Sequence, residues 1–354
     1  MIDFLEVLRE KRALVWPEIK QYLNLMTQMP TYCQVPPKYE SEAKFHFQLV
    51  ADYPERKGKY VRPTLVLLTA AALGFPQEQA IKTAAAMEIS ENWILNHDDI
   101  EDDSLMRRGR PALHRIYGQE LALNAGDGLH LLMWKVLRDN EAVVGTEKAL
   151  TIMDEFYRML NRTVLGQTIE IKWTRENRVD LTDEDILFIF ESKTGYYTIG
   201  GPMRLGAILA GANQDQLGRL YQFGKLMGYC YQITDDLLDL TSNFAGLKKQ
   251  TGNDIYEGKR TMMLVHLFRN IRGKDKRRLL AIMRKSRKEK TEAEVVWVIK
   301  MMEKYGSLVH GRKMLAKFIK QAKEYFDQNL DFLVERPARD QIRAFIDFVA
   351  QRSY

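Results

Sequence analysis

Acidic residues gather at the end of a predicted helix, and this cluster constrains the fold more than any other feature of the chain. Residues 96–117 read NHDDIEDDSLMRRGRPALHRIY, with four aspartates and a glutamate inside six consecutive positions. The preceding AAAMEISENWILNH has helical spacing, and a continued helix places Asp98 and Asp102 on one face. Like charges at that spacing destabilise a bare helix, so we expect a cation between them. Such oxygen ligands suit Mg²⁺, which also keeps waters and substrate phosphates.

A second acidic cluster, in YQITDDLLDL, repeats the spacing of the first. Its surroundings are apolar, so its acids are not expected to form a solvated helix face. One such cluster alone is typical of an ordinary charged surface. Two copies, both entered from apolar helical sequence, favour a site for several Mg²⁺ ions and a polyphosphate.

The rest of the sequence favours one all-α domain over residues 1–354. The chain has 354 residues, of which 45% are hydrophobic and 28% charged, and it shows no strand alternation, hairpin signal or linker. We therefore expect a multi-helix bundle around a deep central cavity, with the two acidic clusters facing each other. Two cysteines imply no disulfide framework, and no apolar run approaches the ~20 residues of a membrane span. A soluble cytoplasmic protein is expected.

Helical periodicity divides the chain into segments. A polar loop is expected at 241–260, and loops of that length are usually functional. Beyond it, helical pattern runs over 261–353 with breaks near Gly273 and Gly306. The earlier helices are expected at 1–30, 43–53, 64–73, 77–103, 111–117, 120–139, 148–173, 182–209 and 214–240.

Positive charge is concentrated in one segment. The formal net charge is +6, and Arg272 to Lys290 holds ten lysines and arginines against two acidic residues. A solvated pair of helices is the simplest interpretation, and contact with an anionic membrane surface is the alternative. Nucleic acid is not expected, because no binding motif accompanies the charge.

Other motifs narrow the chemistry. There is no GxxxxGK[ST] loop, so a nucleotide is not indicated, and no HxxxH or HExxH pair that would suggest zinc. Basic residues occur in the early loop, after each acidic cluster and at Lys193, where they could bind polyphosphate. The apolar helices between suit a hydrophobic substrate tail.

Six ordered motifs together resemble the trans-isoprenyl diphosphate synthase (polyprenyl synthetase) family, of the short-chain farnesyl or geranylgeranyl type. They are GKYVRP, the first DDxxD, RRG, GQxxE, KTG and YQITDDLLD, between about Lys57 and Thr261. The resemblance implies an all-α prenyltransferase, usually a homodimer, that uses three Mg²⁺. Its reaction would be head-to-tail condensation of isopentenyl diphosphate with an allylic diphosphate.

The resemblance also implies roles for individual residues. Lys249 is the least typical, because its interval to Lys259 is one residue longer than is common. Metal ligands would be Asp98, Asp99, Asp102, Asp235, Asp236 and Asp239; allylic-diphosphate ligands Arg107, Lys193, Lys249 and Lys259; isopentenyl-diphosphate ligands Lys59, Arg62 and Arg108; and residues near the developing cation Lys193, Thr194 and Gln232.

One position departs from the family pattern. Seven residues before the first aspartate the family usually has His or Gln, which helps to bind isopentenyl diphosphate, whereas this chain has Glu91. A carboxylate beside a diphosphate is repulsive unless it is protonated or paired. Glu91 is expected either to pair with Lys59 or Arg108, or to indicate weak binding of isopentenyl diphosphate or a changed substrate.

Product length is predicted from Trp93 and Ile94, five and four residues before the first aspartate. A bulky side chain there would close the cavity below the metal, and in the family it accompanies short products. We therefore predict chains of fifteen or twenty carbons, with twenty favoured. The alternative is that Trp93 is a core residue turned toward a neighbouring helix.

Two other functions use the same motifs. A terpene cyclase also has DDxxD and Mg²⁺, but the intact DDLLD, GKxxRP and RRG speak against it. A non-catalytic regulatory subunit of a prenyl synthase tends to lose aspartates, and this chain keeps all six.

Overall fold

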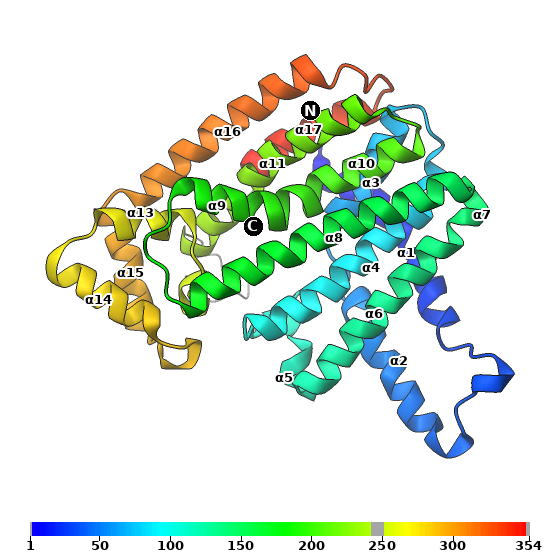
Figure 1. Cartoon of the computed structure of the whole chain (residues 1–354), viewed down its shortest axis with the longest axis horizontal. Coiled ribbons are helices and arrows are strands. Elements are labelled where there is room, and N and C mark those ends of the chain that lie inside the picture. The colour runs from blue at the N-terminus through cyan, green and yellow to red at the C-terminus, as the bar shows by residue number, and fades with distance from the viewer. Residues whose placement is uncertain (1, 242–250, 352–354) are drawn as a thin grey trace. The chain divides into compact units, whose positions relative to one another are not determined.

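The computed structural model describes residues 2–241 and 251–351. Its regular structure is almost entirely helical (Figure 1), which confirms the predicted all-α class. Within the described residues, no helix is long and apolar enough to cross a membrane.

The helices follow the expected segments closely. The bounds in the first half are α1 Phe4–Leu25, α2 Glu40–Glu55, α3 Val61–Ala72, α4 Gln77–Glu101, α5 Leu113–Tyr117, α6 Gln119–Asp139, α7 Glu141–Val144 and α8 Thr146–Arg175. They continue as α9 Asp183–Ile189, a π-helix Phe190–Gly200, α10 Gly201–Leu209, α11 Gln214–Thr241, α12 Asn253–Glu257, α13 Met262–Asn270, α14 Gly273–Arg284, α15 Glu292–Lys304, α16 Ser307–Asn329 and α17 Ala338–Gln351.

Two corrections concern short elements. Met106–Arg107 (β1) and Arg110–Pro111 (β2) form a two-stranded antiparallel hairpin where no hairpin was expected. Its central residues Arg108 and Gly109 have positive φ, the backbone of a tight hairpin turn. The predicted loop at 241–260 contains the short helix α12, so that expectation was wrong over these five residues.

The chain folds as two compact groups of helices. The first comprises the residues up to Glu155 with Pro202–Leu217 and Leu333–Ile342. The second comprises Phe156–Gly201, Gly218–Phe332 and the residues from Arg343 onward. The acidic cluster of α4 belongs to the first group and that of α11 to the second. A single domain over the whole chain stays a prediction.

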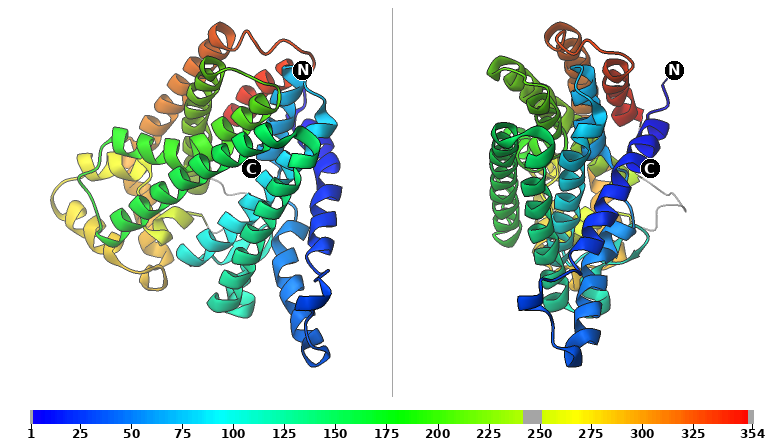
Figure 2. Two further views of the ribbon diagram at one scale, coloured as in Figure 1. Left: turned by 45° about the vertical axis from the view of Figure 1, so that its right-hand side comes forward. Right: turned by 90° about the vertical axis from the view of Figure 1, so that its right-hand side faces the viewer.

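In the first group, α4 packs against α1, α3 and α6, and these helices lie side by side in the views of Figures 1 and 2. A small residue allows α4 and α6 to approach each other closely. A Cβ at Gly126 of α6 would lie 2.4 Å from Nε2 of His97 on α4. His97 thus occupies space that only glycine leaves open, which supports a structural role for this histidine. The packing fixes the end of α4, where the first acidic cluster lies.

In the second group, glycines bring the π-helix against α11. A Cβ at Gly224 would lie 2.2 Å from Cα of Gly200, and one at Gly228 would lie 2.2 Å from Cα of Gly195. No side chain fits at either position without a backbone shift. The contact holds the KTG motif of the π-helix beside the helix that carries the second acidic cluster.

Candidate active site

The carboxylates of the first acidic cluster, at the end of α4, differ in their exposure to solvent. The amide of Asp102 donates to the carbonyl of Asp98 (2.9 Å), so the helical turn continues through both residues and keeps them on one side, as predicted. Asp99, one position on, is fully buried. The predicted trio of metal ligands therefore contains two partly exposed carboxylates and one inside the protein.

Asp99 is held in a buried network. The Tyr53 hydroxyl donates to its Oδ2 (2.6 Å), and the Arg107 guanidinium donates to both carboxylate oxygens, at 2.5 Å for Nη2 to Oδ1 and 2.9 Å for Nε to Oδ2. Burial alone would lower the pKa of Arg107, but the Asp99 carboxylate raises it. Arg107 also lies 3.7 Å from Asp98 Oδ2, so Asp99 fixes this cation beside the exposed carboxylate.

Three predicted isopentenyl-diphosphate ligands lie in the first group. Arg108 Nη1 donates to the Tyr53 carbonyl and to Asn92 Oδ1, both at 2.8 Å. Its guanidinium lies over the GKxxRP loop, because a Cβ at Gly58 would be 2.6 Å from Arg108 Nη2. The glycine of that motif thus makes room for the arginine of RRG, and it brings Arg108 next to the loop that carries Lys59.

Glu91 forms an ion pair with Arg62, and the two side chains are each 16% exposed. The expectation that Glu91 would pair with Lys59 or Arg108 is therefore corrected. Glu88, one turn earlier on α4, lies 3.5 Å from Arg108 Nη2. Burial, together with the Glu91 carboxylate, raises the pKa of Glu88 to about 8. Two of the cations predicted to bind the second diphosphate thus each face a carboxylate of α4.

Trp93 packs toward α6. Its ring stacks on His130, with ring centroids 4.2 Å apart, and meets His97 edge-on at 6.1 Å. His130 is held in turn by Trp134, whose Nε1 donates to its Nε2 (2.9 Å). Trp93 is therefore turned toward a neighbouring helix, which is the orientation that the alternative interpretation as a core residue expects. Its role in product length, like that of Ile94, stays a prediction.

In the second group, a chain of hydrogen bonds joins the KTG motif to the second acidic cluster. Thr194 Oγ1 donates to Gln232 Oε1 (2.9 Å), and Gln232 Nε2 donates to Asp236 Oδ1 (2.9 Å). The family resemblance implies that Thr194 and Gln232 lie together near the reacting centre, and the structure brings them into direct contact. The amide of Gln232 is oriented by these two bonds.

Lys193 pairs with Glu170 of the GQxxE motif. Gly166 makes this possible, because a Cβ there would lie 2.8 Å from Cβ of Ser192 and 3.1 Å from Cγ of Lys193. The glycine lets α8 approach the π-helix, and the glutamate one turn later reaches the lysine. This explains the spacing of the motif, whose glutamate was given no role from the sequence.

Asp239 caps the N-terminus of α12. Its Oδ1 and Oδ2 accept from the backbone amides of Asn253 and Asp254, both at 3.1 Å. Beyond α12, Lys259 pairs with Glu257 at 2.8 Å. The predicted ligand Lys249 lies outside the described residues. The end of α11 is thus tied to the segment that carries Lys259.

The acidic residues fit a magnesium site of the open kind. Within residues 2–241 and 251–351, no three acidic, histidine or cysteine side chains gather closely enough to hold a metal alone. Mg²⁺ is usually held by one or two carboxylates with waters and phosphate oxygens, which is what each cluster offers. Asp236 Oδ2 is buried without a hydrogen-bond partner, and burial raises the pKa of Asp236 to about 8, with Asp235 and Asp239 adding to the effect. A bound cation would relieve both features.

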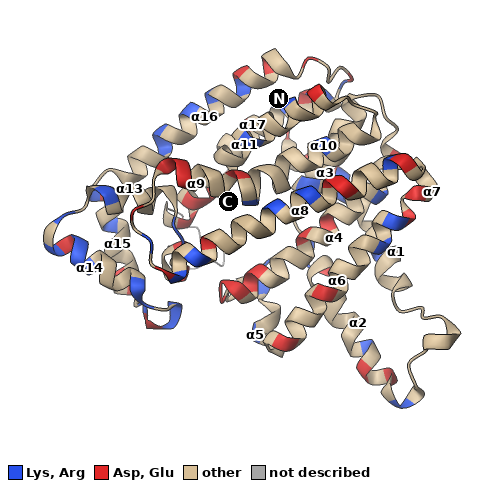
Figure 3. Cartoon of the chain, in the orientation of Figure 1, with Lys and Arg blue, Asp and Glu red and all other residues tan. Residues whose placement is uncertain are grey.

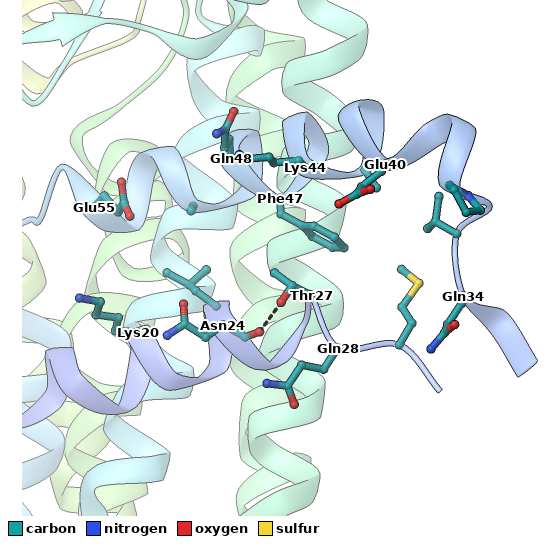
Figure 4. A pocket seen from close by; sticks show the side chains of 16 residues that line it. Lys20, Asn24, Thr27, Gln28, Gln34, Glu40, Lys44, Phe47, Gln48 and Glu55 are labelled. Atoms are coloured by element: carbon teal, nitrogen blue, oxygen red, sulfur yellow. Dashed lines mark hydrogen bonds between the residues drawn. The ribbon is translucent and has the colours of Figure 1, made fainter. Parts of the chain in front are cut away.

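A separate hollow of about 780 Å³ lies between the end of α1 and α2. Figure 4 shows Lys20, Asn24 and Phe47 among its lining side chains. None of the site residues predicted from the sequence lines it.

Comparison with known proteins identifies the same family that these motifs resemble. Residues 44–302 match the polyprenyl synthetase family. A short chain isoprenyl diphosphate synthase of Methanothermobacter thermautotrophicus is 33% identical over 298 residues, which are 84% of this chain and 87% of that protein.

Solved structures have the same architecture. The geranylgeranyl pyrophosphate synthetase of Pyrococcus horikoshii has a TM-score of 0.82 and 29% identity, over 99% of this chain and 98% of its own. A geranylgeranyl pyrophosphate synthase of Corynebacterium glutamicum, complexed with isoprenyl diphosphate and magnesium, has a TM-score of 0.84 over 99% of this chain and 100% of its own. At 22% identity, this second likeness bears on the fold alone.

Proposed function

The chain belongs to the polyprenyl synthetase family, and we propose that it condenses isopentenyl diphosphate head-to-tail with allylic diphosphates to products of fifteen or twenty carbons, with twenty favoured. As a family member it is a prenyltransferase that forms short-chain prenyl diphosphates. The observation that supports condensation with a second diphosphate is that its predicted ligands, Lys59, Arg62 and Arg108, lie in the same helical group as Asp98 and Asp102. A terpene cyclase has no use for that second site.

We propose that the chain uses three Mg²⁺ ions, bound through carboxylates of both clusters. When bound, magnesium would neutralise the diphosphate that leaves the allylic substrate. Asp98 and Asp102 would hold metal in the first cluster, and Asp235 with Asp239 and Asp236 in the second. Asp99 would act from inside the protein, by fixing Arg107 beside Asp98.

The remaining steps are assigned to the residues of the chain. Arg107, Lys193 and Lys259 would bind the leaving diphosphate, because fixed cations stabilise the charge that develops there. The oxygen dipoles of Thr194 and Gln232 would lie near the allylic cation. The double bond of isopentenyl diphosphate would attack that cation, and the proton lost afterwards would pass to the departing diphosphate, so no protein base is assigned.

A homodimer is part of the proposal. Large apolar side chains are exposed on α6 and α8, among them Leu131 (70%), Leu150 (58%) and Tyr157 (63%). Exposed apolar side chains of this size are typical of surfaces that another chain covers.

Product analysis tests the proposed function. The chain is incubated with Mg²⁺, labelled isopentenyl diphosphate and one allylic diphosphate at a time, and the products are dephosphorylated and separated by length. We expect linear prenols of fifteen or twenty carbons. Cyclic hydrocarbons formed without isopentenyl diphosphate would identify a cyclase, and no product from any substrate would favour a regulatory subunit.

Glu91→Gln is expected to lower the Michaelis constant for isopentenyl diphosphate about fivefold, with little change in kcat. The substitution removes the carboxylate that engages Arg62 and repels the incoming diphosphate. Glu91→His, which restores the common family residue, should act in the same direction. A raised constant in both variants would show that Glu91 positions Arg62, and an unchanged one that the residue does not face the site.

We propose that the Trp93 ring forms the floor of the tail site, so Trp93→Ala is expected to lengthen the product by at least one five-carbon unit. Product length is read by chromatography of the dephosphorylated prenols. Trp134→Ala is the matched control, since Trp134 supports the same His130 without being assigned to the tail site. Wild-type products of thirty carbons or more would exclude the proposed floor, as would unaltered products from Trp93→Ala.

A further inference from the structure

Helix α14 and the turn after it carry a large net positive charge. Residues 272–290 contain ten lysines and arginines against two acidic residues, while the whole chain has a formal charge of +6. The net charge of this segment is therefore more positive than that of the whole chain, and the residues outside it carry a slight net negative charge. Figure 3 shows lysines and arginines along α14 and the turn that follows it.

Four of the five cations of α14 lie on one side of the helix. Leu279, Ile282 and Met283 are buried and attach the helix to its group. Opposite them, four exposed cations follow helical spacing, which places them on a common surface. We call this surface the basic face; it consists of Lys274, Arg277, Arg278 and Arg284.

Nearby acids are already engaged by other cations. Asp275, the one acidic residue of α14, lies 3.6 Å from Lys304 of α15. Glu294 is paired with Lys285 at 2.5 Å. Within the described residues, no carboxylate lies within 4.0 Å of the basic face, and Arg278 instead covers the Trp297 ring at 4.4 Å. The positive charge of the basic face is therefore directed at solvent, with no counter-ion among the described residues.

We propose that the basic face docks on an anionic phospholipid bilayer. A cluster of four or more lysines and arginines attracts such a surface electrostatically. The choice of a bilayer over other polyanions rests on the proposed function, because a prenyl diphosphate has a hydrophobic tail that partitions into lipid. No base-reading motif of the sequence accompanies the charge to favour nucleic acid.

The turn after α14 joins this surface to the proposed substrate site. Arg287 donates to Asn253 Oδ1 (2.6 Å), and Lys290 donates to the Tyr256 carbonyl (2.9 Å), so both hold α12. Lys259, the proposed allylic-diphosphate ligand, follows α12 by two residues. Docking would therefore place the bilayer next to the packed region that binds the diphosphate end of the lipid.

Vesicle co-sedimentation of the full chain tests the proposal. The vesicles contain either phosphatidylcholine alone or phosphatidylcholine with a third of phosphatidylglycerol. We expect binding to the anionic vesicles only, and its loss in 1 M salt, where the Debye length falls to about 3 Å. Changing Lys274, Arg277, Arg278 and Arg284 together to Gln should weaken binding at least about 100-fold, while prenyltransferase activity in solution is retained.

The matched control removes the same number of charges from α16, where Arg312, Lys313, Lys317 and Lys320 are also exposed. Changing these four residues to Gln should leave vesicle binding within about twofold of wild type. Equal binding to both kinds of vesicle, equal loss in the two variants, or tighter binding to duplex DNA than to anionic vesicles would each overturn the proposal. Vesicle binding needs no turnover, so an inactive chain that still docks would contradict the proposed function and not the docking.

Discussion

Replacing Asp99 with alanine is expected to lower the free energy of unfolding by about 3 kcal/mol, because the mostly buried Arg107 guanidinium would lose the carboxylate that pairs with it. The Tyr53 hydroxyl loses its acceptor at the same time. Denaturant unfolding measures the change. The adjacent Asp98→Ala, at a partly exposed carboxylate, should stay within about 0.5 kcal/mol of wild type.

A double substitution separates lost pairing from general damage at this position. If the cost of Asp99→Ala arises from the unpaired arginine, Asp99→Ala combined with Arg107→Met should be more stable than Asp99→Ala alone. An Asp99→Ala protein as stable as Asp98→Ala would show that the buried network contributes little. Asp99 would then be free to act as a metal ligand like its neighbours.

Asp98→Ala and Asp235→Ala are each expected to reduce turnover by about 1,000-fold or more, because each removes a proposed magnesium ligand on which departure of the diphosphate depends. The fold should persist in both, since the change relieves repulsion between neighbouring acids. Steady-state turnover per folded molecule is the measurement.

Asp103→Ala is the matched control for the first cluster. Asp103 belongs to the same acidic run, but its Oδ1 is paired with Arg115 at 2.6 Å and it is not assigned to the metal. Its replacement should leave turnover within about threefold of wild type. Near-normal turnover in Asp98→Ala or Asp235→Ala with Mg²⁺ supplied would rule out the assigned ligands.

The helices and the acidic clusters could be predicted from the sequence, because both depend on residues at short spacing along the chain. Asp98 and Asp102 share a side of α4 as the i to i+4 rule requires. The separate role of Asp99 was not readable, since it depends on Tyr53 and Arg107, which come from other elements. One position along a helix rotates a side chain to a different face, and only tertiary packing decides which face is buried.

Pairings between distant residues were the other limit. Glu91 was recognised as unusual, but its partner Arg62 could not be chosen from several nearby cations. The glycine of GQxxE was visible, yet its purpose appears only when α8 and the π-helix are seen to touch at Gly166. Spacing such as Gly-x-x-x-Glu is a signal that could have suggested Glu170 as a partner for a lysine of another helix.

The most direct test is the ratio of diphosphate released to labelled isopentenyl diphosphate incorporated, measured for the wild-type chain with a short allylic diphosphate. Head-to-tail condensation predicts one diphosphate for each isopentenyl unit added, in the presence of Mg²⁺, and neither event when a chelator removes the metal. Diphosphate release that does not depend on isopentenyl diphosphate, or incorporation that continues without a divalent cation, would contradict magnesium-dependent chain elongation at this site.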